Sequence, residues 1–143
     1  MFATKRNIER ATAYADVVIG AVLVPGERAP VLVTGEMVRA MKPRSVIIDV
    51  CIDQGGCVET SRPTMHDNPA FIEENIVHYC VPNIPSLVAR TASHVFLNAA
   101  MPCIADIANQ GVDAVMKDQP SIKSAINTHK GKLMELKRLS AKE

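Results

Sequence analysis

Short, continuous apolar runs are the main feature of the first half of the chain. They lie at residues 17–24, 46–50 and 76–81 and are rich in valine and isoleucine. Each run is too short for a helix and too continuous for a half-exposed strand, so it is typical of a parallel strand buried on both faces. We therefore expect about three parallel strands.

Helical spacing surrounds the first two of these runs. Asn7 is the expected cap of a helix over residues 8–15, and Thr34 is the expected cap of a second helix over residues 34–41. The second helix lies between two strands, so strand, helix and strand form a βαβ unit with a right-handed crossover. The fold class is α/β. The polar, turn-rich segment 61–69 is expected to lie on the surface or over a ligand.

The last third of the chain has helical spacing. A long helix is expected over residues 86–109, with Pro102 kinking or splitting it and Gly111 ending it. Shorter helices are expected around residues 112–116 and 121–126. The C-terminal end is strongly basic, and its cations form either a solvated face or an anion site: Lys130, Lys132, Lys137, Arg138 and Lys142.

Charge and composition exclude some partners. The net charge is +1, and the chain has three Phe, two Tyr and no Trp. This balance gives no electrostatic reason to expect nucleic acid or membrane partners, and base-stacking surfaces are not expected. The N-terminus shows no signal-peptide pattern and no apolar run approaches a membrane span, so we expect a cytoplasmic protein with free thiols.

The thiols do not predict a metal site. A ligand set can be drawn from Cys51, Cys57, Cys80, His66 and His78. No close Cys-x-x-Cys pair anchors it, however, and such a pair is typical of protein zinc sites. We therefore predict no metal.

The loop after the second apolar run is the strongest candidate for chemistry. Asp53-Gln54-Gly55-Gly56 follows the expected strand directly. Open α/β sheets bind ligands at the carboxyl ends of their strands, so a carboxylate beside two glycines is well placed for catalysis. The alternative is that Asp53 caps a turn and the glycines only permit positive φ.

Several segments together resemble the alanine dehydrogenase and nicotinamide nucleotide transhydrogenase family. They are residues 15–26, Ala29-Pro30, residues 36–38, Met41-Lys42-Pro43, Ile52-Asp53-Gln54-Gly55-Gly56-Cys57, residues 59–64 and residues 78–85. The transhydrogenase branch usually has Glu-Ala-Gly-Gly-Asn where this chain has residues 53–57. The alanine dehydrogenase branch therefore fits better.

The resemblance implies a Rossmann fold and NAD-dependent oxidative deamination of L-alanine to pyruvate and ammonia. It makes Asp53 the catalytic residue, beside the nicotinamide. It also implies a cofactor-lining set, largely through the backbone: Val22, Leu23, Val50, Cys51, Ile52, Asp53, Arg62, Val81, Pro82, Asn83 and Ile84. Pro82 departs from the family's usual alanine and removes a backbone donor.

Part of the family's site is missing from this sequence. No G-x-G-x-x-G can be made from its glycines, so the pyrophosphate cradle is absent. In the family the substrate-binding Arg and Lys and the catalytic His belong to an N-terminal domain, so His66, His78, His94 and His129 are expected to be surface or packing residues. The chain then corresponds to the second half of a Rossmann sheet in residues 1–85, followed by C-terminal helices in residues 86–143.

This division leaves the strand at residues 17–24 as an apolar edge. We expect another chain to cover it, either a partner that supplies the N-terminal half or a second copy of this one. The expected function is alanine dehydrogenase-like, with the chain inactive alone. The alternatives are a non-catalytic binding or assembly module derived from the family, and a transhydrogenase-type nucleotide-binding domain.

Overall fold

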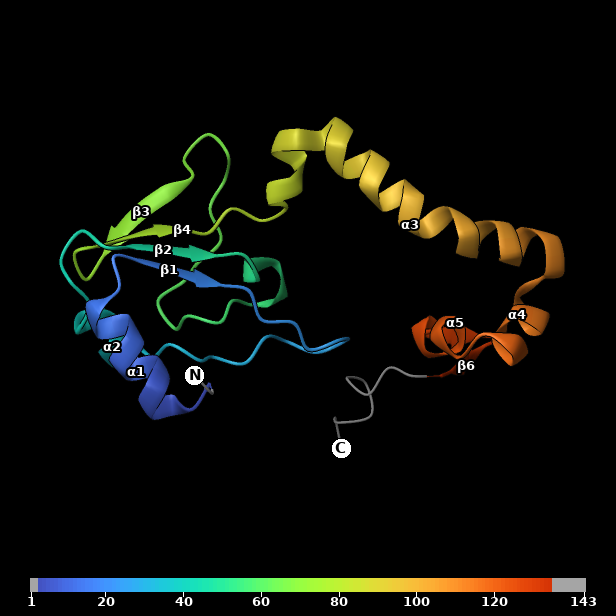
Figure 1. Cartoon of the computed structure of the whole chain (residues 1–143), viewed down its shortest axis with the longest axis horizontal. Helices are drawn as coiled ribbons and strands as arrows, with labels where there is room; N and C mark the ends of the chain where they lie inside the picture. Colours follow the sequence, from blue (N-terminus) through green and yellow to red (C-terminus); the bar gives the residue numbers. More distant parts are fainter. Residues whose placement is uncertain (1–2, 135–143) are drawn as a thin grey trace. The chain divides into compact units, whose positions relative to one another are not determined.

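The chain divides into two compact units, Met1–Ile84 and Pro85–Glu143. A computed structural model describes residues 3–134. The first unit contains the four-stranded sheet, and the second is mainly helical (Figure 1).

The sheet of the first unit has the strand order β1-β2-β4-β3. The three predicted strands are confirmed and are parallel to one another, while the fourth strand is antiparallel to its neighbour. The strands are β1 (Val17–Gly20), β2 (Val46–Asp49), β3 (Ala70–Glu73) and β4 (Ile76–Tyr79). The first strand is shorter than the apolar run that predicts it and lies at the edge of the sheet, as expected.

Strand β3 was not predicted. It forms a hairpin with β4 through a two-residue turn at Glu74 and Asn75, whose φ values are 53° and 62°. Two positive φ angles are typical of the hairpin turn that matches the twist of the strands, but that turn usually contains glycine. The glutamate in this turn therefore hides the hairpin in the sequence.

Helices α1 (Lys5–Tyr14) and α2 (Gly35–Arg39) pack next to each other on one side of the sheet (Figure 1). The predicted Thr34 cap is confirmed, since its side chain accepts a hydrogen bond from the Met37 N–H at 3.3 Å. The predicted Asn7 cap is wrong. Thr4 caps α1 instead, because its hydroxyl accepts the N–H of Asn7.

Only one face of the sheet is well buried. Ile47 and His78 lie on that face and are fully buried. Ile47 belongs to a hydrophobic core that includes Val38 and Met37 of α2. On the other face, Ile19 is 64% exposed. The prediction of strands buried on both faces is therefore wrong for β1, because the described helices α1 and α2 of this unit both pack on the first face, with Ile47.

Gly20 ends β1 at a position that has no room for a side chain. A Cβ atom there would collide with Cys57 Sγ. We expect Gly20→Ala to lower the free energy of unfolding by about 1–3 kcal/mol, because the overpacked site must shift.

Urea denaturation measures this effect, with Gly35→Ala as the matched control. A Cβ at Gly35 has its nearest contact at 3.5 Å, so alanine there is expected to be neutral or slightly stabilising. Equal stability of Gly20→Ala and the parent chain would contradict the packing at this strand end.

The second unit begins within η2 (Ile84–Val88) and continues as the predicted long helix, α3 (Ala89–Gln110). Pro102 lies inside α3 without splitting it, and Gly111 ends the helix as predicted. The remaining elements are α4 (Val112–Asp118), α5 (Pro120–Ala125) and an unpredicted hairpin of β5 (Thr128–His129) and β6 (Lys132–Leu133). None of the helices in the described part of the chain is long and apolar enough to cross a membrane.

Two of the basic C-terminal residues lie in the described part of the second unit. The Lys130 ammonium donates a hydrogen bond to Asp113, and Lys132 is exposed. The hydrogen bonds from Lys130 and His129 lower the pKa of the Asp113 carboxyl. Lys137, Arg138 and Lys142 lie outside the described residues.

Candidate functional site

The carboxyl ends of β1, β2 and β4 lie at one edge of the sheet, because these strands are neighbours and parallel. Three loops leave the sheet there. They carry residues 21–24, 50–56 and 80–84, which include all the sequence-predicted cofactor-lining residues except Arg62. In an open α/β sheet this edge is where ligands bind.

Asp53 lies at the middle of the central loop, in the short 3-10 helix η1 (Ile52–Gln54). Its neighbour Ile52 points inward and is 4% exposed, whereas Asp53 is exposed. Within residues 3–134, its carboxylate has no hydrogen bond or ion pair. Asp53 therefore does not cap a turn here, and its carboxylate is available to a ligand.

The two glycines after η1 are required by the local geometry. Gly55 has φ 98° and Gly56 has φ 74°, a region that L side chains rarely adopt. A Cβ at Gly55 would collide with the Arg28 side chain, and one at Gly56 would lie 2.9 Å from Asp49 Oδ2. The glycines thus permit the positive φ angles that a turn requires. They also allow the Arg28 and Asp49 side chains to pack closely against the loop that carries Asp53.

The loop that follows β1 supports the Asp53 loop through the backbone. Ala29 N donates to Gln54 O at 2.9 Å, and Leu32 N donates to Cys57 O at 2.8 Å. Further along, Val33 pairs with Val58 in an isolated parallel bridge. These contacts hold η1 beside the β1 loop.

Asp49 is a positioning residue that the sequence analysis missed. It ends β2, is fully buried, and its Oδ2 accepts the backbone N–H groups of Cys57 at 3.1 Å and Val58 at 3.3 Å. Its Oδ1 faces the thiols of Cys51 at 3.2 Å and Cys57 at 3.8 Å. One carboxylate therefore holds both ends of the loop that carries Asp53. The only signal in the sequence was an aspartate at the end of a buried run.

The buried thiol of Cys57, beside Asp49, is held in its protonated form. Burial raises the pKa of the Cys57 thiol to about 12, with further contributions from its hydrogen bond with Cys51 and from the Asp49 charge. Burial also raises the pKa of the Cys80 thiol. At neutral pH Cys57 is protonated and can donate to Asp49.

Arg62 is oriented by the unpredicted strand β3. Its guanidinium carbon lies 4.0 Å from the centre of the Phe71 ring, and its Nη1 lies 3.7 Å from Glu73 Oε2. Phe71 in turn stacks on His78 with ring centroids 4.9 Å apart. Phe71 and Glu73 are thus two further positioning residues, and the unrecognised hairpin hid them in the sequence.

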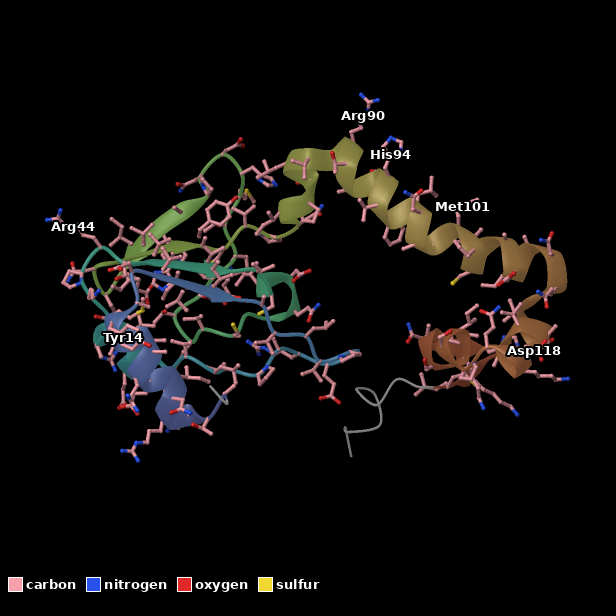
Figure 2. The ribbon with its side chains drawn as sticks, in the orientation of Figure 1. Tyr14, Arg44, Arg90, His94, Met101 and Asp118 are labelled. Atoms are coloured by element: carbon pink, nitrogen blue, oxygen red, sulfur yellow. The ribbon has the colours of Figure 1, made fainter. Side chains whose placement is uncertain are left out.

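The histidines of the described residues have structural or surface positions. His78 is fully buried, and its Nδ1 donates to Ile76 O at 3.0 Å, which leaves Nε2 to accept from the Thr60 hydroxyl at 2.8 Å. His129 pairs with Asp113. His94 is exposed on α3 (Figure 2), and His66 is exposed in the loop before β3.

The remaining sequence-predicted residues lie in the loops that follow β1, β2 and β4. Cys51 and Val81 have buried side chains, so only their backbones can face a ligand. Leu23 is 67% exposed, and Asn83 forms the turn after β4 with φ 55°. Gln54 Oε1 is buried with no hydrogen-bond partner in the described part of the chain. Such an atom is a suitable acceptor for a ligand's donor.

A family model described as "Alanine dehydrogenase/PNT, C-terminal domain" matches residues 1–135. This chain belongs to that family. As a member of the alanine dehydrogenase/PNT family, it is similar to the alanine dehydrogenase of Halomonas elongata, with 45% identity over 133 residues, 93% of this chain and 36% of the relative. It is 47% identical to the alanine dehydrogenase of Bacillus subtilis over 126 residues, 87% of this chain and 33% of the relative.

Solved structures of the same family share the fold. An L-alanine dehydrogenase matches with a TM-score of 0.75 and 44% identity over 91% of this chain and 36% of that chain. The transhydrogenase from Sinorhizobium meliloti matches with a TM-score of 0.71 and 26% identity over 90% of this chain and 35% of that chain. The chain therefore has the Rossmann-like α/β fold of these proteins and spans about a third of the length of its relatives, as a C-terminal portion.

Proposed function

We propose that this chain supplies the nicotinamide side of an alanine dehydrogenase-type active site. The observation that carries the proposal is the Asp53 carboxylate, which is exposed and unpaired within the described residues at the end of a central parallel strand. It lies in a chain that is 45% identical to an alanine dehydrogenase. The reaction converts L-alanine, NAD⁺ and water into pyruvate, ammonium, NADH and a proton.

The described residues fit part of a nicotinamide dinucleotide. The turns at the carboxyl ends of β1, β2 and β4 would line the nicotinamide through residues 22–23, 50–53 and 81–84, with Arg62 at the side. The unpaired Gln54 Oε1 supplies one hydrogen-bond acceptor. No glycine-rich phosphate loop is present in this sequence, so the pyrophosphate must be held by groups outside it.

Asp53 has two tasks in this proposal. The bound NAD⁺ supplies the hydride acceptor. The Asp53 carboxylate moves protons on the substrate nitrogen and on the attacking water, and its negative charge stabilises the iminium that develops when hydride leaves. Asp49 and Arg28 hold η1 in place for these tasks. The Asp49 carboxylate accepts the Cys57 N–H, and the Arg28 guanidinium donates to Gly55 O.

Cofactor binding by the isolated chain is expected to be weak. The absent phosphate and ribose contacts remove several kcal/mol of binding free energy, so the Kd for NADH is expected in the millimolar range or above. Fluorescence titration measures it. The comparison is a chimera in which this chain replaces the matching 133-residue segment of the Halomonas elongata alanine dehydrogenase.

The chimera restores the missing contacts and is expected to bind NADH at least about 100-fold more tightly than the isolated chain, a difference of roughly 3 kcal/mol. Equal and weak binding by both proteins would count against a cofactor site on this chain. A micromolar Kd for the isolated chain would show that its missing contacts are supplied by self-association.

The open edge of the sheet supports a partner for β1. Within the described residues β1 pairs only with β2, while Val17 and Ile19 are 53% and 64% exposed. An apolar edge strand of this kind favours association. We expect this edge to be covered by a second copy of the chain or by a chain that supplies the N-terminal half. We also propose that the protein acts in the cytoplasm.

Sedimentation velocity of the isolated chain at micromolar concentration tests this association. An assembly larger than the monomer is expected, because β1 has unpaired backbone groups and exposed valine and isoleucine. Lysine in place of Ile19, which should block edge pairing, is expected to shift the distribution towards the monomer. A parent chain that sediments as a monomer would contradict the proposal.

A second function remains open for the isolated chain, that of a binding or assembly module without catalysis. The edge strand β1, which pairs only with β2 within the described residues and is exposed to a partner chain, favours it. NADH-dependent amination of pyruvate by the purified chain, lost in Asp53→Asn, would exclude it. A transhydrogenase-type role is less well supported, since identity to the transhydrogenase structure is 26% against 44% for the alanine dehydrogenase structure.

A further inference from the structure

Three buried side chains form a compact cluster at the carboxyl end of β2. Their polar atoms, Asp49 Oδ1, Cys51 Sγ and Cys57 Sγ, all lie within 4.8 Å of one another. The backbone N–H groups of Cys57 and Val58 bind Oδ2, so the other carboxylate oxygen faces the sulfur atoms. None of the three side chains contacts a ligand in the proposed reaction.

The spacing of these atoms matches a tetrahedral metal site. With a zinc–sulfur distance of about 2.3 Å and a zinc–oxygen distance of about 2.0 Å, a tetrahedral angle places oxygen and sulfur ligands about 3.5 Å apart. The Oδ1 to sulfur distances here are 3.2 Å for Cys51 and 3.8 Å for Cys57. Shifts of a few tenths of an ångström would therefore bring both pairs to the tetrahedral value.

We propose that Asp49, Cys51 and Cys57 bind one divalent cation of the zinc class. The two sulfur ligands select borderline and soft metals such as Zn²⁺, Co²⁺ and Cd²⁺ over Mg²⁺ or Ca²⁺. Binding releases the two thiol protons to solvent and oxidises nothing. A water molecule or another small ligand takes the fourth position.

The surroundings of the cluster fit this role. A Cβ at Gly20 would collide with Cys57 Sγ and would lie 3.6 Å from Asp49 Oδ1. Glycine at this position therefore leaves enough space for the sulfur atom. The N–H groups of Cys57 and Val58 orient the carboxylate and offset part of the negative charge of the ligands.

The sequence spacing did not reveal this site because its third ligand is the carboxylate at the end of β2. Asp49 belongs to the strand, while the two cysteines bracket the loop that follows it. His78 and Cys80, which the sequence analysis had considered, lie outside the cluster. A bound cation would tie both ends of the Asp53 loop to the sheet. The proposal does not depend on the proposed catalysis.

Titration of the chain with Cd²⁺ or Co²⁺ tests the site. The exposed Cys103 is first changed to serine to remove a surface ligand, and a phosphine keeps the other thiols reduced. We expect sulfur-to-metal charge-transfer absorption that saturates at about one metal per chain, with release of about two protons. The absorption should be lost in Cys51→Ala and in Cys57→Ala and retained in Cys80→Ala, the buried-cysteine control.

X-ray absorption of the Zn²⁺-loaded parent chain gives a readout that needs no variant. Two sulfur neighbours at about 2.3 Å are expected, with oxygen or nitrogen completing the shell. A shell without sulfur, no charge-transfer absorption at all, or absorption that persists in the Cys51→Ala, Cys57→Ala double variant would overturn the proposal. Each of these results is independent of NADH binding or turnover.

Discussion

Changing Asp53 to asparagine in the chimera is expected to lower kcat for alanine oxidation by about 10²–10⁴-fold, the range for loss of a general acid–base group. Asparagine keeps the shape of the side chain but cannot exchange protons, and it lacks the charge that stabilises the iminium. NADH binding should change little, because the cofactor-lining contacts proposed around Asp53 are mainly made by the backbone.

The matched control for this variant is Asp118→Asn. Asp118 is an exposed carboxylate at the end of α4 (Figure 2) and belongs to the second unit, whereas the sequence-predicted site residues all belong to the first. Its kcat is expected to stay within about twofold of the parent chimera, since surface substitutions are usually silent. If Asp53→Asn behaves like Asp118→Asn, then Asp53 is not catalytic.

Changing Asp49 to alanine is expected to lower the free energy of unfolding by about 3 kcal/mol. The change leaves the buried N–H groups of Cys57 and Val58 without an acceptor, and an orphaned buried donor costs about 1–3 kcal/mol. Urea denaturation of the isolated chain measures the loss. In the chimera the same variant should also lower kcat, because both ends of the Asp53 loop lose their attachment to β2.

The control for Asp49 is Asp53→Ala. Asp53 is exposed and has no partner within the described residues, so its removal is expected to change stability by no more than about 0.5 kcal/mol. The two aspartates are only four positions apart, but their variants are expected to differ. Asp49 stabilises the fold, whereas Asp53 serves the reaction. Similar stability of the two variants would refute the role given to Asp49.

The sequence was sufficient to predict the parallel strands. Runs such as Ser45-Val46-Ile47-Ile48 combine β-branching with a length too short for a helix, and the structure pairs β1, β2 and β4 as expected. It was insufficient for β3, because the Glu74-Asn75 turn lacks the glycine that usually marks such a hairpin. Burial on both faces also failed as a prediction, since it depends on helices that do not cover β1 in this unit.

Some residues of the candidate site could likewise be predicted from the sequence, and others could not. The position of Asp53 after a buried strand could be predicted, because the carboxyl end of a parallel strand is a property of local sequence and topology. The role of Asp49 could not, since its partners are backbone N–H groups eight and nine residues away and depend on how the loop folds back. The support of Arg62 by Phe71 and Glu73 likewise required the unrecognised strand.

Alanine-dependent reduction of NAD⁺ by the unmutated chimera tests the central claim most directly. If this chain carries the nicotinamide side of an alanine dehydrogenase-type active site, the chimera should turn over within about tenfold of the parent enzyme, a difference of roughly 1.4 kcal/mol in transition-state free energy. A chimera that folds and binds NADH with the parent's affinity but does not oxidise alanine would contradict the claim.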